Sequence, residues 1–114
     1  MEATKKLVIG DPFDKKTDMG ALISKQHYEK VTSYIELAKK DGGVILCGGD
    51  KPANLAAHNA DGYFLNPTVI TNIGPSSRVF MDEIFGPVVT ITKFKTEEEG
   101  SHPSFTFLFA INDY

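Results

Sequence analysis

The sequence predicts an α/β fold with a few strands and one main amphipathic helix at about residues 24–41. Apolar residues recur at helical spacing in the stretch "ISKQHYEKVTSYIELAKK", and short apolar runs rich in β-branched residues follow it. A chain of 114 residues is long enough for one domain with a modest core. We therefore expect a single helix-and-strand unit.

The helix is the best supported element because its face and both of its ends have sequence signals. Its apolar face is formed by Tyr28, Val31, Ile35 and Ala38. Ser24 is a typical N-cap residue, and the pair Gly42–Gly43 is typical of a helix end. Lys39 and Lys40 place positive charge in the last turn, where it complements the helix dipole.

Three later segments are predicted to be extended. The run "VILC" at 44–47 lies between two Gly-Gly pairs, which is typical of a short buried strand. The polar stretch 48–62 resembles a surface loop. Extended backbone is then expected at 63–71, where Pro67 disfavours helix in the residue before it, and at 88–94, where β-branched residues alternate.

The C-terminal segment has a different character. The stretch "KTEEEG" at 95–100 suits a first helical turn, but Gly100 and Pro103 would interrupt the helix almost at once. The stretch "SFTFLFAI" at 104–111 is aromatic, uncharged and prone to form a strand. We expect it either to add to an exposed sheet edge or to drive self-association.

Composition argues against several classes of function. The net charge is -3, with 12 Lys and Arg among 15 Asp and Glu, so the chain has no basic stripe and nucleic acid is not expected as a partner. No apolar run is long enough to cross a membrane, and the N-terminal stretch is too weakly hydrophobic for a secretory signal. The lone Cys47 cannot form an internal disulfide, which fits a reducing compartment. We expect a cytoplasmic location.

Four segments occur in an order that resembles the NAD(P)-dependent aldehyde dehydrogenase superfamily: "GDPFDKKTDMGALIS", "HYEKVTSYIELAKKDGG", "GYFLNPTVIT" and "EIFGPV". The resemblance covers roughly residues 2–99 and implies a partial catalytic domain at 1–99, followed by a divergent tail at 100–114. Within the superfamily, the chain is most similar to a branch whose substrates are small dicarboxylic semialdehydes.

The resemblance implies a cofactor contact in the motif "EIFGP". In similar enzymes its acid binds the nicotinamide ribose hydroxyls and its aromatic lies against the nicotinamide, which correspond here to Glu83 and Phe85. His27 and Lys30 correspond to helix positions that lie toward the cofactor. The residue types alone favour other interpretations: an acid before a turn is usually solvated, and an aromatic before Gly-Pro usually packs in a core.

The nucleophile of the resembled enzymes is a cysteine, but Cys47 does not match its surroundings. The family nucleophile follows a glycine-glutamine pair in a loop, whereas Cys47 ends an apolar, strand-like run. We therefore expect Cys47 to be buried and unreactive. The histidines at 27, 58 and 102 form no metal-binding pattern, so no metal site is predicted.

Two interpretations of function stay open at this point. In the first, the chain is a fragment of an aldehyde dehydrogenase that lacks the nucleophile, the general base and the dinucleotide-binding domain, so by itself it neither binds NAD(P) nor catalyses the reaction. In the second, it is a non-catalytic interaction protein that pairs with itself or with full-length dehydrogenase subunits through a sheet edge or the aromatic tail.

Overall fold

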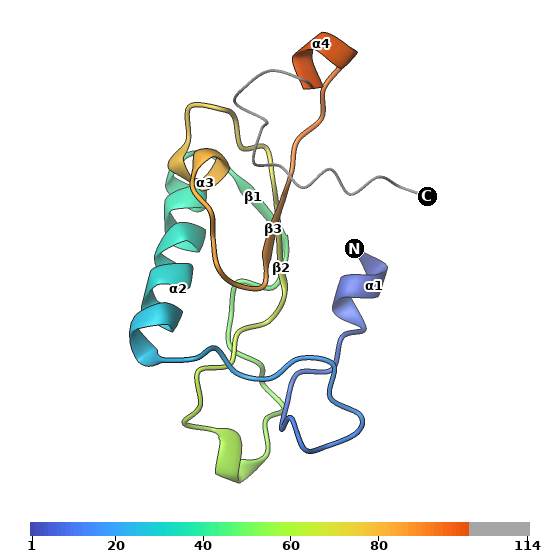
Figure 1. Ribbon diagram of the computed structural model, residues 1–114, viewed down its shortest axis with the longest axis vertical. Helices are drawn as coiled ribbons and strands as arrows, with labels where there is room; N and C mark the ends of the chain where they lie inside the picture. Colours follow the sequence, from blue (N-terminus) through green and yellow to red (C-terminus); the bar gives the residue numbers. More distant parts are fainter. Residues whose placement is uncertain (101–114) are drawn as a thin grey trace.

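The computed structural model describes residues 1–100, and the predicted strand at 104–111 lies outside them. In chain order the elements are α1 (Glu2–Lys5), α2 (Lys25–Lys40), β1 (Val44–Cys47), the 3-10 turn η1 (Ala57–Asn59), β2 (Thr68–Thr71), α3 (Arg78–Met81), β3 (Val88–Ile91) and α4 (Glu97–Gly100). Figure 1 shows α2 along one side of the strands and α1 on the other side. The α/β prediction is confirmed.

Local sequence signals define both ends of α2. The Ser24 hydroxyl accepts a hydrogen bond of 3.1 Å from the His27 backbone N–H, which satisfies one of the unpaired donors of the first turn. At the other end Gly42 has a φ of 83°, and the N–H of Gly43 donates to the Ala38 carbonyl at 2.8 Å. This pattern is a Schellman motif, which favours glycine because of the positive φ. The predicted helix at about 24–41 is confirmed.

The three strands form a mixed sheet in the order β1-β2-β3. β1 and β2 are antiparallel, with a bulge between Ile45 and Cys47, whereas β2 and β3 are parallel. The strand predicted at 44–47 is confirmed, but it is not buried, because Val44 is exposed and the other three residues are half-buried. In the two longer stretches predicted to be extended, the strands are limited to Thr68–Thr71 and Val88–Ile91, which pair with each other.

The core lies between α2 and the sheet. The buried hydrophobic residues are Val31, Tyr34, Ile35, Ala38, Phe64, Leu65, Val69, Ile70, Ile73, Val79 and Phe80. Ile35 on α2 and Ile70 on β2 are both fully buried, and burial of such a side chain contributes about 1.5–3 kcal/mol. Val31, Ile35 and Ala38 are buried on α2 as the amphipathic pattern predicts. Tyr28 is only half-buried, and the buried Tyr34 was not predicted.

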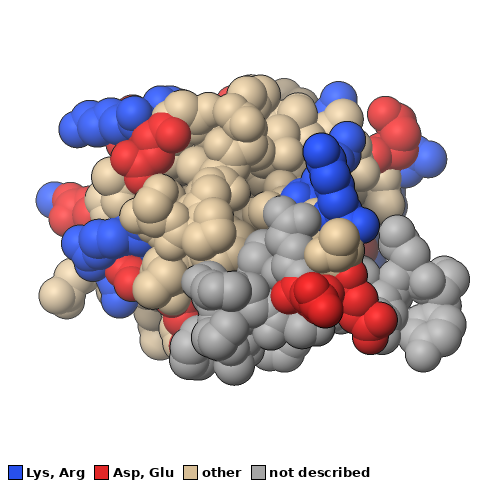
Figure 2. Space-filling view, turned by 90° about the horizontal axis from the view of Figure 1, so that it is seen from above, with Lys and Arg blue, Asp and Glu red and all other residues tan. Residues whose placement is uncertain are grey.

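The remaining segments are short and mostly exposed. α1 and α3 were not predicted, because a single helical turn has too few residues to show a periodic pattern. The stretch 48–62 is largely irregular, as predicted, and contains only η1. On the face seen in Figure 2, acidic and basic side chains are interspersed around a tan centre. None of the helices in the described part of the chain is long and apolar enough to cross a membrane.

Candidate functional site

The motif predicted to contact the cofactor connects α3 to β3, and its side chains alternate in exposure. Asp82 and Ile84 are partly buried, whereas Glu83 and Phe85 between and after them are exposed. Phe85 is 67% exposed. Asp82 has extended backbone angles, φ -87° and ψ 147°, so the chain leaves α3 in a conformation in which successive side chains point to opposite sides. The two predicted cofactor residues therefore share the outer side.

The inner side of the motif packs against the helix. Ile84 contacts both core clusters, one of which contains Val31 and the other Tyr34. Gly86 approaches α2 so closely that a Cβ atom on it would lie 2.8 Å from Cγ2 of Val31. A glycine is needed here for lack of space, and its φ is not in the left-handed region. Both contacts hold the inner side of the motif against the core and α2.

The outer side carries one acid and one aromatic without internal partners. Among residues 1–100, no hydrogen bond or ion pair involves the Glu83 side chain, and no ring pair involves Phe85. An aromatic before Gly-Pro usually packs in a core, but that interpretation is wrong for Phe85, because Ile84 occupies the inward position. A solvated acid and an exposed ring thus lie two residues apart, and Glu83 and Phe85 together form the outer edge of the motif.

A polar cluster that the sequence did not predict adjoins this edge. The Tyr34 hydroxyl on α2 donates to Asp82 Oδ2 at 2.8 Å, and Arg78 donates to the same oxygen through Nε at 3.0 Å and a terminal nitrogen at 2.9 Å. The Tyr34 bond, followed by the Arg78 bond, lowers the pKa of Asp82 below 3.8. The same interaction raises the pKa of the Tyr34 hydroxyl.

The i,i+4 spacing of Arg78 and Asp82 was the one sequence signal for this cluster. Tyr34 lies 48 residues before Asp82 in the sequence. No local pattern connects residues so far apart.

The two helix residues predicted to lie toward the cofactor have different surroundings. Lys30 is exposed, and its charge contributes to the lowered pKa of Asp82, after the larger contributions from Tyr34 and Arg78. Lys30 therefore lies on the side of α2 that faces the motif. His27 is half-buried in the first turn, and in the described part of the chain no hydrogen bond joins its ring to Glu83.

Cys47 is less buried than predicted. It is a free thiol, half-buried at the end of β1, and its sulfur lies 4.0 Å from the Pro67 carbonyl oxygen. It lines a hollow of about 350 Å³ whose other lining residues are Thr4, Lys5, Leu7, Gly48, Asn66 and Pro67. The prediction of full burial is wrong because the thiol lines this hollow, which is open beside the N-terminal segment. Neither an acid nor a histidine is among the residues that line this hollow.

A second polar contact lies at the other end of the molecule. His58 Nε2 is 3.2 Å from Asp11 Oδ2 and joins the loop after β1 to the N-terminal segment. The Phe13 backbone N–H, followed by His58, lowers the pKa of Asp11. Among residues 1–100, no group of three or more His, Cys, Asp or Glu side chains is arranged to hold a metal ion.

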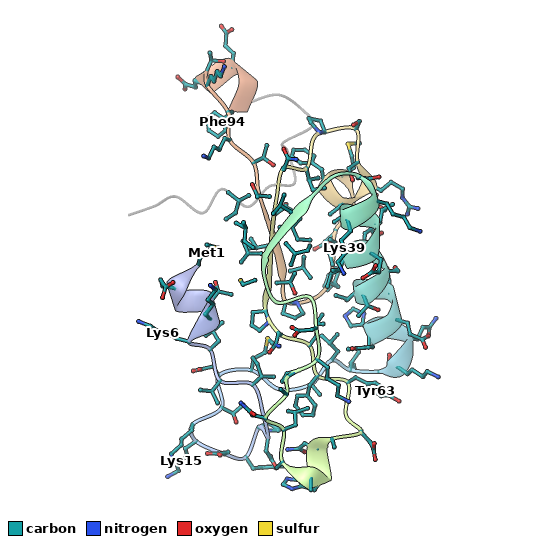
Figure 3. The ribbon with its side chains drawn as sticks, turned by 180° about the vertical axis from the view of Figure 1, so that it is seen from behind. Met1, Lys6, Lys15, Lys39, Tyr63 and Phe94 are labelled. Carbon is teal, nitrogen blue, oxygen red and sulfur yellow. The ribbon has the colours of Figure 1, made fainter. Side chains whose placement is uncertain are left out.

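Figure 3 shows how the outlying segments flank the centre of the fold. Lys39 lies toward the C-terminal end of α2, and Phe94 lies between β3 and α4. Tyr63 lies beside the start of α2, and its ring is 6.2 Å from that of Tyr28. The motif residues 82–86 connect α3 to β3 and pack against α2.

Comparison with known proteins identifies the family of this fold. The sequence model that describes the aldehyde dehydrogenase family matches residues 1–102 of this chain. The chain is 50% identical over 100 residues to the 2-aminomuconic semialdehyde dehydrogenase of Mus musculus, covering 87% of this chain and 20% of that protein. It is 48% identical over 99 residues to the 5-carboxymethyl-2-hydroxymuconate semialdehyde dehydrogenase of Escherichia coli, covering 86% and 21%.

Comparison with solved structures indicates the same family. The betaine aldehyde dehydrogenase of Staphylococcus aureus, solved in complex with NAD+, matches with a TM-score of 0.78 and 43% identity, covering 86% of this chain and 19% of that chain. The chain therefore spans about a fifth of the length of the relatives that it matches. Its small mixed sheet and flanking helices form part of an α/β aldehyde dehydrogenase domain, and the chain belongs to the aldehyde dehydrogenase family.

Proposed function

We propose that this chain forms the part of an aldehyde dehydrogenase that contacts the nicotinamide ribose of NAD(P). The observation that supports the proposal is the shared outward orientation of Glu83 and Phe85, which Ile84 and Gly86 hold from the inner side. The reaction of the whole enzyme is the oxidation of an aldehyde to a carboxylic acid. Because semialdehyde dehydrogenases are among its relatives, we propose a small dicarboxylic semialdehyde as the substrate of the whole enzyme.

The residues of this edge fit the chemistry of the cofactor. An ionised carboxylate accepts hydrogen bonds from two neighbouring ribose hydroxyls, and no described internal partner competes for Glu83. The exposed ring of Phe85 offers an apolar surface to the flat nicotinamide. When bound, NAD(P) accepts the hydride from the substrate. Glu83 orients the ribose, and Phe85 shields one side of the nicotinamide from water.

Lys30 and His27 have more peripheral roles in this proposal. Lys30 adds positive charge beside the motif, which favours a cofactor that carries phosphates. His27 supports the first turn of α2 through its backbone bond to Ser24. We expect each of these two side chains to contribute less to cofactor binding than Glu83 does, because neither residue belongs to the motif.

The experiment that tests the proposal requires a complete active site. Residues 1–99 replace the matching segment of the Staphylococcus aureus betaine aldehyde dehydrogenase, and Glu83→Ala is compared with Glu29→Ala, which removes an exposed acid from α2. We expect Glu83→Ala to raise the KM for NAD about 10-fold or more, since it removes charge-assisted hydrogen bonds. The Glu29→Ala control is expected to leave KM unchanged. An unchanged KM in both variants would refute the ribose contact.

One observation favours a second function, in which the chain pairs with a full-length dehydrogenase subunit or with itself. Within residues 1–100, β1 and β3 each have one unpaired edge, and Val89 and Ile91 of β3 are exposed. Size-exclusion chromatography of the chain, alone and mixed with a full-length relative, tests this proposal. Co-elution supports pairing, whereas separate monomeric peaks contradict it.

A further inference from the structure

We propose that Asp82 is a positioning residue for cofactor binding: by joining α2 to α3, it sets the outward direction of Glu83 and Phe85. The inference rests on the proposed ribose contact and extends it to a residue that does not touch the cofactor. It starts from one carboxylate oxygen, Asp82 Oδ2, which accepts the bonds from both Tyr34 and Arg78.

Asp82 is the point at which the chain leaves α3. Its backbone N–H donates to the Arg78 carbonyl at 2.8 Å and closes the last turn, while its own ψ of 147° is already extended. Its side chain is directed to the Tyr34 hydroxyl on α2. Because side chains alternate along extended backbone, an inward Asp82 places Glu83 on the outer side.

Two further contacts continue the alternation along the motif. Ile84 is inserted between the core clusters, and Gly86 lies against Val31 of α2. The even-numbered residues 82, 84 and 86 therefore hold the segment to the helix through a polar, an apolar and a backbone contact. The packing of Ile84 is apolar and non-directional, whereas the Asp82 carboxylate accepts hydrogen bonds from defined donors. Asp82 is consequently the contact that specifies the direction of the backbone.

The same chimeric enzyme tests the inference. Asp82→Asn keeps the size of the side chain and removes its charge, and Tyr34→Phe removes the other end of the bond while keeping the ring. We expect each variant to raise the KM for NAD on the order of 10-fold, through misplacement of Glu83. kcat and the KM for the aldehyde are expected to change less. Asp82→Glu keeps the charged acceptor and is expected to restore most of the NAD affinity.

The two variants share one interaction, so their effects are expected to be non-additive: the double variant should resemble either single variant. Ser33→Ala serves as the control, because within residues 1–100 the Ser33 hydroxyl bonds only to the Lys30 carbonyl of α2. Additive effects, or equal losses of kcat and NAD affinity that Asp82→Glu does not restore, would overturn the positioning role.

Failure of the inference is distinguishable from failure of the proposed function. If Glu83→Ala raises the KM for NAD but Asp82→Asn does not, the ribose contact stands and the positioning role is refuted. If neither changes it, the proposed function fails.

Amide hydrogen exchange of the 114-residue chain adds a test that needs no enzyme activity. Exchange at Gly86, whose N–H donates to the Ile84 carbonyl, is expected to accelerate at least about 10-fold in Asp82→Asn relative to Ala38 in α2. Unchanged relative exchange contradicts the inference.

Discussion

Gly86 lies directly against Val31, and a Cβ atom on Gly86 would be 2.8 Å from Cγ2 and 3.0 Å from Cγ1 of that side chain. Val31 is almost fully buried on α2. The helix and the motif thus meet at a position where even a methyl group does not fit. This contact relates the packing of the core to the outward direction of Glu83 and Phe85.

Gly86→Ala is expected to destabilise the fold by about 1–3 kcal/mol, because the added methyl overpacks the contact with Val31. Urea unfolding measures the change. Gly74→Ala is the matched control, since a Cβ on Gly74 meets nothing within 4 Å and should change stability little. If Val31→Ala in the same chain relieves the cost of Gly86→Ala, the steric cause is supported. Equal effects of the two glycine substitutions would contradict it.

Ser77→Ala is expected to cost about 0.5–2 kcal/mol, the usual range for loss of an N-cap. Ser77 is buried, its hydroxyl accepts from the Val79 N–H at 3.2 Å, and it also donates to the Asp41 carboxylate at the end of α2. Ser76→Ala alters an exposed neighbour and should be nearly neutral. Thermal unfolding of the two variants decides the matter, and similar midpoints would show that the cap contributes nothing.

The stability of the chain is expected to fall in acid partly through Asp82. Hydrogen bonds from Tyr34 and Arg78 lower its pKa in the folded state below 3.8. The unfolded chain therefore binds the proton more readily, so the stabilisation is present above about pH 4 and is lost as the pH falls through the folded pKa. Asp82→Asn should lose less stability between about pH 5 and pH 2 than the parent chain does. Parallel pH profiles of unfolding would contradict this assignment.

The 114-residue polypeptide by itself is expected to show no aldehyde oxidation and negligible NAD affinity. Its single cysteine, Cys47, is half-buried beside the Pro67 carbonyl, and Glu83 supplies only a fraction of a dinucleotide site. Reduced nucleotide formation at millimolar aldehyde and calorimetric titration with NAD measure the two properties. Activity that disappears in Cys47→Ala would make that thiol the nucleophile. Saturable binding that weakens in Glu83→Ala would make the chain a cofactor-binding module.

The sequence by itself determined the elements whose signals are local. The limits of α2 follow from Ser24 at its start and Gly42 at its end, because caps act within one helical turn. The short strands follow from β-branched runs between glycines and prolines. The order of the four motifs identified the family, and the comparisons confirmed it.

Only the tertiary structure decided which way the motif faces. The residue types favoured a core position for Phe85, whereas the family resemblance implied a cofactor contact. Its outward position depends on Ile84 and Gly86 packing against a helix formed some 50 residues earlier. The bond between Tyr34 and Asp82 and the half-burial of Cys47 have the same origin. Contacts between distant segments form when the chain packs, and no pattern within one segment specifies their partners.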